Sequence, residues 1–150
     1  MANGIYEFVM SDFHIVTSNF RLKGDKEYDL GKIFDLAVTL NMKHEFIAED
    51  NALKLSMTVE IIGDEMPFTL AIEGASLFTF NNRIEDPSEL DQVAQINCAS
   101  ITFPYLREVV ADTVRRSGLP PLHLPPVNFI EIYKQKQDGL APDVGGKISG

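Results

Sequence analysis

The chain has 150 residues, of which 45% are hydrophobic and 23% charged, and its formal net charge at pH 7 is −9. This composition is typical of a soluble globular protein with one domain and excludes a disordered chain. The negative charge disfavours nucleic acid as a partner, because acidic groups repel phosphates. No apolar run approaches the ~18 residues that a membrane-spanning helix needs, so we expect no membrane insertion.

The first two predicted strands lie in the N-terminal third of the chain. Residues 5–20 are rich in aromatic and β-branched side chains, which predicts a strand with a bend near Ser11 and Asp12. Residues 32–45 alternate strictly between apolar and polar side chains. Because successive side chains of a strand point to opposite faces, this alternation predicts a half-buried strand of an antiparallel sheet.

Two further predicted strands follow after short polar turns. Residues 53–61 and 68–80 show the same alternation of apolar and polar side chains. In the second segment the phase breaks at Gly74, which indicates a bulge or bend. Four strands in a row, joined by short turns, predict a meander with one apolar face.

Two helical segments are predicted next. Asp86 and Pro87 are typical of a helix start, and a kink or break is expected near residues 97–100. A long helix then begins near Pro104, which suits a first helical position, and ends before Gly118, which suits a positive φ. Its apolar stripe, at spacings of three and four residues, consists of Leu106, Val109, Val110, Thr113 and Val114.

Residues 119–127, which we call the strap, place four aliphatic side chains among four prolines. Proline fixes φ and lacks a backbone donor, so the strap should be stiff, extended and poor in hydrogen bonds. Such a segment either packs onto the core of its own chain as a lid or offers apolar surface to a partner. Both interpretations are open from the sequence alone.

The predicted fold class is therefore α+β. It consists of a four-stranded antiparallel meander sheet, followed by a long helix and a short C-terminal helix, residues 127–137, packed on one face. We expect a single domain over residues 1–137. Residues 138–150, rich in Gly and other small residues, should form a flexible C-terminal tail.

The sequence offers little to support catalysis. None of its three histidines has a Cys or a clustered carboxylate at metal-ligand spacing, and no nucleophile signature is present. We therefore expect no enzyme activity, no metal site and no cofactor. The single cysteine, Cys98, cannot form an internal disulfide, which fits the cytoplasmic location that we expect.

A family resemblance is carried by two blocks near the C-terminus. Phe103-Pro104-Tyr105 with Arg107-Glu108, and Pro126-Val127-Asn128-Phe129 after the strap, resemble the FPYARE and PVNF blocks of SecB, the export chaperone of bacteria. The spacing between the blocks also fits. The resemblance implies a homo-tetramer, a dimer of dimers in which the long helices lie between two outer sheets.

The same resemblance implies functions for particular residues. SecB-like proteins bind unfolded or partly folded polypeptides without ATP and pass them to the SecA motor. Residues 68–72 would support the tetramer through Phe68, Leu70 and Ile72, although an ordinary core role is the alternative. Asp12 matches an acidic position used for SecA docking, whereas Val16 and Ala71 stand uncharged at two others. The candidate client-binding residues are Leu119, Leu122, Leu124, Val127 and Phe129.

The sequence is also compatible with other functions. The missing acidic positions leave room for a SecB-like chaperone of a dedicated client, such as the antitoxin of a toxin–antitoxin system. A sheet under helices can also enclose an apolar pocket, which would suit a small-molecule or lipid carrier. A structural subunit, with the strap as its interface, is a third class.

Overall fold

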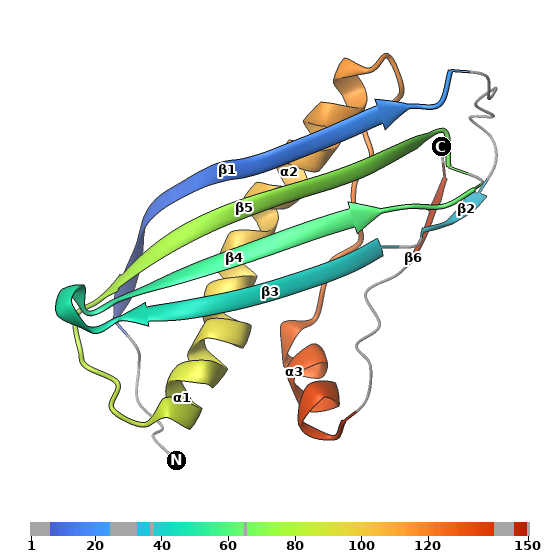
Figure 1. Ribbon diagram of the computed structural model, residues 1–150. Helices are drawn as coiled ribbons and strands as arrows, with labels where there is room; N and C mark the ends of the chain where they lie inside the picture. The colour runs from blue at the N-terminus through green and yellow to red at the C-terminus, as the bar shows by residue number, and fades with distance from the viewer. Residues whose placement is uncertain (1–6, 25–32, 37, 65, 140–145, 150) are drawn as a thin grey trace.

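The computed structural model describes residues 7–24, 33–36, 38–64, 66–139 and 146–149. It has two layers, a twisted antiparallel sheet and a long helix that crosses one face of it (Figure 1). This arrangement confirms the predicted α+β class. The four main strands are β1 (Phe8–Leu22), β3 (Val38–Ile47), β4 (Ala52–Ile61) and β5 (Phe68–Phe80).

The strand order is β1-β5-β4-β3. The last three strands form the predicted meander, but β1 pairs with β5 instead of β3, so the order departs from a simple meander at this one place. Sequence neighbours pair in most sheets, and this preference led to the wrong partner for β1. Alternation identifies a strand and its buried face but carries no information about which strand lies beside it.

A second, two-stranded sheet joins β2 (Ile33–Leu36) to β6 (Gly146–Ser149). The single strand predicted at residues 32–45 is thus two strands, β2 and β3. The pairing of β6 lies within residues 138–150, where the sequence predicted only a tail. The flexibility of the tail itself stays a prediction.

The irregularities between β1 and β5 lie on β1. Its register shifts between Met10 and Asp12, where the sequence predicted a bend, and again between Ile15 and Thr17. The second shift is opposite Gly74, because Ile15 pairs with that residue. The bulge predicted in β5 is therefore wrong, since β5 pairs with β4 without a register shift through Gly74 and the extra residue lies on β1.

The packing around position 74 leaves little room for a side chain. A Cβ at this position would lie 2.9 Å from the ring of Phe13 and 3.4 Å from Leu106. Both neighbours lie on the helix-facing side of the sheet, so the missing side chain lets the Phe13 ring lie across β5. The glycine thereby sets the position of an aromatic ring on the neighbouring strand.

The helical layer is one continuous run. It comprises α1 (Pro87–Gln92), the π-helical segment η2 (Val93–Cys98) and α2 (Ala99–Arg116). The Oδ1 atom of Asp86 accepts a hydrogen bond from the backbone N–H of Ser88 at 2.9 Å, which confirms the predicted start. The junction residues of these segments have right-handed helical φ and ψ. The predicted kink is therefore a wide turn within a continuous helix.

Pro104 lies inside α2, not at its first turn, so the predicted start of the long helix is wrong. A proline within a helix removes the donor for the carbonyl four residues earlier, here Ser100. Both residues are exposed, so water can bind that carbonyl. The predicted end is confirmed, because Gly118 has a φ of +95°.

The core lies between α2 and the inner face of β4 and β5. Leu106, Val110 and Val114 of the predicted stripe are buried there. The hydroxyl groups of Ser76 and Thr102 form a buried hydrogen bond, 2.8 Å long, that fixes β5 against α2. The chain then continues through the strap to the short helix α3 (Phe129–Gln137).

We expect the Gly74→Ala substitution to lower the free energy of unfolding by about 1–2 kcal/mol, because the new methyl group forces the Phe13 ring to move. Urea unfolding measures the change. Gly63→Ala is the matched control, since its Cβ would meet Met66 at an ordinary 3.4 Å. The steric explanation predicts that Phe13→Leu restores part of the stability of the Gly74→Ala protein; no recovery would contradict it.

Candidate functional site

The strap is extended, and its side chains alternate between core and solvent. Leu122 and Leu124 are 5% and 1% exposed. Pro121, beside Leu122, and His123, between the two leucines, are exposed to solvent. Successive side chains of an extended backbone point to opposite sides, and the prolines hold the backbone in that form. One side of the strap therefore belongs to the core and the other side faces solvent.

This alternation bears directly on the predicted client-binding residues. Leu122, Leu124 and Phe129 are buried within their own chain, and Leu119 and Val127 are half-buried against the same core. Three of the five thus present almost no surface in this conformation, contrary to the interpretation in which the strap offers apolar surface to a partner. Their role in client binding stays a prediction.

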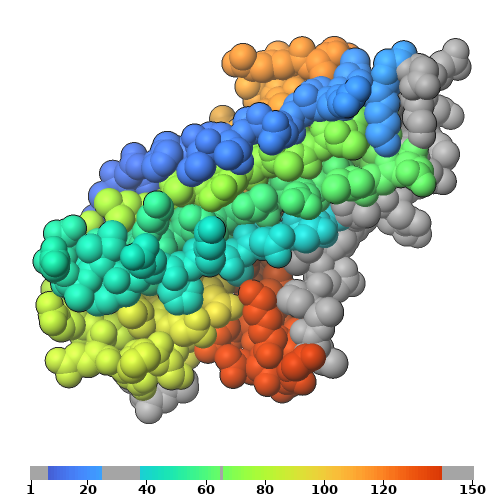
Figure 2. All heavy atoms as spheres, in the orientation of Figure 1, coloured from blue at the N-terminus to red at the C-terminus, as the bar shows by residue number. Residues whose placement is uncertain are grey.

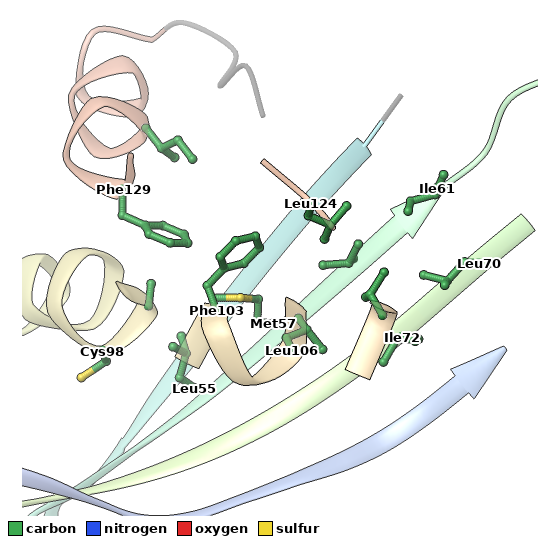
Figure 3. Close-up of a cluster of buried hydrophobic side chains, with 14 of the residues drawn as sticks. Leu55, Met57, Ile61, Leu70, Ile72, Cys98, Phe103, Leu106, Leu124 and Phe129 are labelled. Carbon is green, nitrogen blue, oxygen red and sulfur yellow. The ribbon is translucent and has the colours of Figure 1, made fainter. Parts of the chain in front are cut away.

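The strap is held mainly by these apolar contacts. The Nε atom of Arg107 donates a hydrogen bond of 2.6 Å to the carbonyl oxygen of Leu124. Within the described part of the chain, residues 119–127 make no backbone–backbone hydrogen bond to any other segment. At the start of α3, the ring of Phe129 meets that of Phe103 edge to face at 5.8 Å, as Figure 3 shows.

An open apolar groove, which we call the α2 groove, lies beside the strap. Its volume is about 580 Å³, and most of its lining surface is apolar. Tyr105 of α2 is 47% exposed there, and its ring lies 5.5 Å from that of Phe13 on β1. The apolar lining is formed by Phe13, Tyr105, Val109, Ala111 and Pro121.

The rim of the α2 groove carries charges of both signs. Asp112 accepts hydrogen bonds from Arg115 and from Arg116, the latter at 2.9 Å. These hydrogen bonds hold the pKa of Asp112 below its usual range, so the group stays negative but is paired. Glu108 and His123 complete the rim, and neither has an ion-pair partner among the described residues.

The α2 groove was not predicted from the sequence. The sequence contains one indication of the groove, the aromatic residue Tyr105 outside the buried stripe. Because Tyr105 directly precedes Leu106, the two side chains cannot lie on the same face of the helix. Phe13 could not be found in this way, since only the sheet register brings β1 next to α2. The sequence shows a glycine at position 74, but it does not show that the Phe13 ring lies next to this glycine.

A second, enclosed apolar space lies under the strap. It is lined by Val38, Leu40, Phe103, Leu124, Pro125 and Val127. Its volume of about 10 Å³ is close to that of a single water-sized probe. This space is a packing gap between β3, α2 and the strap, too small for a ligand.

The predicted oligomer-support residues face the helices, as expected. Phe68, Leu70 and Ile72 are at most 2% exposed and belong to the main core, part of which Figure 3 shows. They can affect an assembly only through the position of α2, because they present no surface of their own. Their role in oligomer support stays a prediction.

The opposite face of the sheet carries mostly polar side chains. Its strands lie at the front of the space-filling view (Figure 2). Asp12 lies on this face, and its Oδ2 atom is 2.8 Å from Nδ1 of His14. Val16 shares a shallow hollow with side chains of both charges, and Ala71 lies in another, beside Arg21. The charged residues around these two positions are Arg21, Lys43, Glu45, Lys54, Glu60 and Glu73.

The described residues include no group of three side chains that could hold a metal ion. Burial raises the pKa of the Cys98 thiol to about 12, so this cysteine is a poor nucleophile at neutral pH. Among the helices of the described part, none is long and apolar enough to cross a membrane.

Comparison with known proteins agrees with this architecture. The family model for SecB, the preprotein translocase subunit, matches residues 30–139. The protein-export protein SecB of Nitrosococcus oceani is 35% identical over 135 residues, covering 89% of this chain and 80% of the relative. That of Thiobacillus denitrificans is 34% identical over 113 residues, covering 73% of this chain and 72% of the relative.

A solved structure has the same fold. It is a Mycobacterium tuberculosis SecB-like chaperone in complex with a ChAD peptide from an antitoxin, with a TM-score of 0.69 and 20% identity, covering 80% of this chain and 90% of that one. The predicted resemblance is therefore confirmed. Because the family model matches most of the chain, the chain belongs to the SecB family of protein-export chaperones.

Proposed function

We propose that the protein is an ATP-independent holdase that binds non-native polypeptides in the cytoplasm. The observation that carries this proposal is the α2 groove, an open and mostly apolar surface lined in part by the exposed ring of Tyr105. Large exposed apolar patches on a folded protein commonly mark interaction sites. Family membership supports the same function.

The groove suits many clients because apolar burial has no direction. It contributes about 25 cal/mol per Å² of buried surface whatever the sequence of the client. Non-native chains expose such surface, and folded proteins hide it. The net charge of −9 keeps the chaperone molecules apart while their apolar surface is exposed.

We further propose the tetramer that the family resemblance implies. In the described sheet β1 has β5 on one side only, which leaves one edge of this long strand free for a second copy. On α2, Ile101 is 39% exposed, and we place the contact between the helices of two dimers there. Phe68, Leu70 and Ile72 would support this contact by holding α2 in place.

Transfer of clients to SecA is the less supported part of the family function. An acidic docking face would need further carboxylates on the same face of the sheet as Asp12, but Val16 and Ala71 are uncharged and their surroundings carry both signs. This observation favours a second candidate, a chaperone dedicated to one client. The related M. tuberculosis chaperone, solved with an antitoxin peptide, supports that alternative.

A lipid or small-molecule carrier is not proposed. The enclosed apolar space under the strap holds about one water-sized probe, far below the several hundred Å³ of a typical ligand pocket. The α2 groove is larger but open, and open apolar surface suits a polypeptide better than a ligand that must be shielded from water.

The holdase proposal predicts that the protein suppresses the light scattering of an aggregating, chemically unfolded client at stoichiometric ratios. We expect Tyr105→Ala to weaken this activity about tenfold in apparent affinity, because it removes an exposed aromatic ring from the lining of the groove. The control is Ile62→Ala, which changes an exposed apolar residue that directly follows β4. Equal losses in both variants would exclude the groove, and no suppression by the unmodified protein would exclude the holdase.

The assembly proposal predicts a particle of four 16.7 kDa chains in light scattering coupled to size exclusion. Ile101→Asp should reduce it to two chains, since a carboxylate would be desolvated between the helices. Ile62→Asp, on an exposed position away from α2, should leave four. A monomeric mass for the unmodified protein at micromolar concentration would contradict the proposal.

The charge argument predicts weak binding to SecA that improves when the missing carboxylates are supplied. We expect the double variant Val16→Glu and Ala71→Glu to bind SecA at least about fivefold more tightly than the unmodified protein, and less so at high salt. Val9→Glu, elsewhere on β1, is the matched control. Tight binding by the unmodified chain would show that Asp12 and its neighbours already suffice.

A further inference from the structure

The wall of the α2 groove formed by α2 carries its charges in a fixed order along the helix. Tyr105, Glu108, Asp112 and Arg115 follow one another at spacings of three and four residues, so they lie along one side of the helix. Glu108 and Arg115 are seven residues apart, which corresponds to two helical turns, or about 10 Å along the axis. An aromatic ring, a carboxylate and a guanidinium group thus succeed one another along the groove.

The two carboxylates of this wall differ in their partners. Glu108 is exposed and has no ion-pair partner among the described residues. The two oxygens of Asp112 accept hydrogen bonds from Nη2 of Arg115 and from Nε of Arg116. One negative charge therefore faces two positive charges at that end of the groove. The wall is negative at Glu108 and carries one excess positive charge two turns further along.

The rest of the lining is mostly apolar. Val109 and Ala111 lie between the two charged positions on α2, and Phe13 of β1 and Pro121 of the strap also line the groove. His123 of the strap is a further basic side chain of the lining. Apolar contacts hold a client without fixing its position along the groove, because apolar burial has no direction. Charges can fix that position.

The separation of the two charges matches the repeat of an extended polypeptide. Such a chain rises about 3.3 Å per residue, so it covers about 10 Å in three residues. A client that lies along α2 can therefore place a basic side chain at Glu108 and an acidic side chain, three positions further on, at Arg115. A large apolar residue beside the basic one would then contact Tyr105, which lies one turn before Glu108.

We propose that the α2 groove selects its clients by the order of their charges. It prefers an extended segment in which a large apolar residue is followed along the groove by a basic residue and, about three positions on, by an acidic residue. Glu108 and Arg115 are the specificity-determining residues. The opposite order brings like charges together at both positions, which disfavours such a segment. This inference rests on the proposed holdase function, because it concerns the same groove.

Two fluorescent peptides of identical composition test the order directly. One has the core Phe-Lys-Ser-Ser-Glu and the other Phe-Glu-Ser-Ser-Lys, each between neutral flanks, and a second pair with inverted cores covers the opposite chain direction. In fluorescence anisotropy with the full chain at pH 8, we expect the first order to bind about fivefold more tightly at low salt. The difference should vanish at 1 M salt, where charges are screened. Equal affinities in both chain directions, or no binding of any peptide, would overturn the inference.

Two substitutions that raise the net charge equally should shift the preference in opposite directions. Glu108→Gln should reduce it to about twofold, because the site for the basic residue is lost. Asp112→Asn should raise it to about tenfold, because Arg115 and Arg116 are then both free to attract the acidic residue. Glu45→Gln, on the opposite face of the sheet, is the matched control and should leave it at fivefold. Parallel shifts in the two groove variants, or an equal shift in the control, would overturn the inference.

Aggregation of an unfolded client, followed by light scattering, separates this inference from the holdase itself. If the unmodified chain suppresses aggregation but does not distinguish the two charge orders, the holdase stands and the charge selection is overturned. If the chain neither suppresses aggregation nor binds a peptide, the holdase fails, and the charge selection fails with it.

Discussion

The packing of α2 on the inner face of β4 and β5 is the interaction on which the other features depend. It buries the stripe of Leu106, Val110 and Val114 against the sheet, and the Ser76–Thr102 hydrogen bond fixes the helix there. With that face used for the core, Ile101 and Tyr105 of α2 stay exposed. The surface available for partners is therefore a consequence of how the core is made.

The strap shows the same division within one short segment. A stiff extended chain has two sides, so it cannot place Leu122 and Leu124 in the core and offer them to a partner in the same conformation. In the closed state, binding capacity lies beside the strap, in the α2 groove. Only a change in the position of the strap and α3 would make the leucines available.

Much of the fold could be predicted from local patterns. Strand alternation, the helix start at Asp86, the stripe of α2 and the end at Gly118 are set by side chains a few residues apart, and all four were predicted. The start near Pro104 failed because tertiary packing outweighs the local preference of one proline. The partner of β1 and the Phe13–Gly74 contact failed because they depend on strand order, which no local pattern encodes.

The sequence by itself determined the fold class, the buried faces and, through the FPY and PVNF blocks, the family. Only the tertiary structure decided which apolar residues are open to a partner. Periodicity reports that a side chain is apolar and which side of its own element it occupies. Whether that side is covered depends on segments far away in the chain: β1 brings Phe13 to Tyr105, and β3 and α2 close over Leu124.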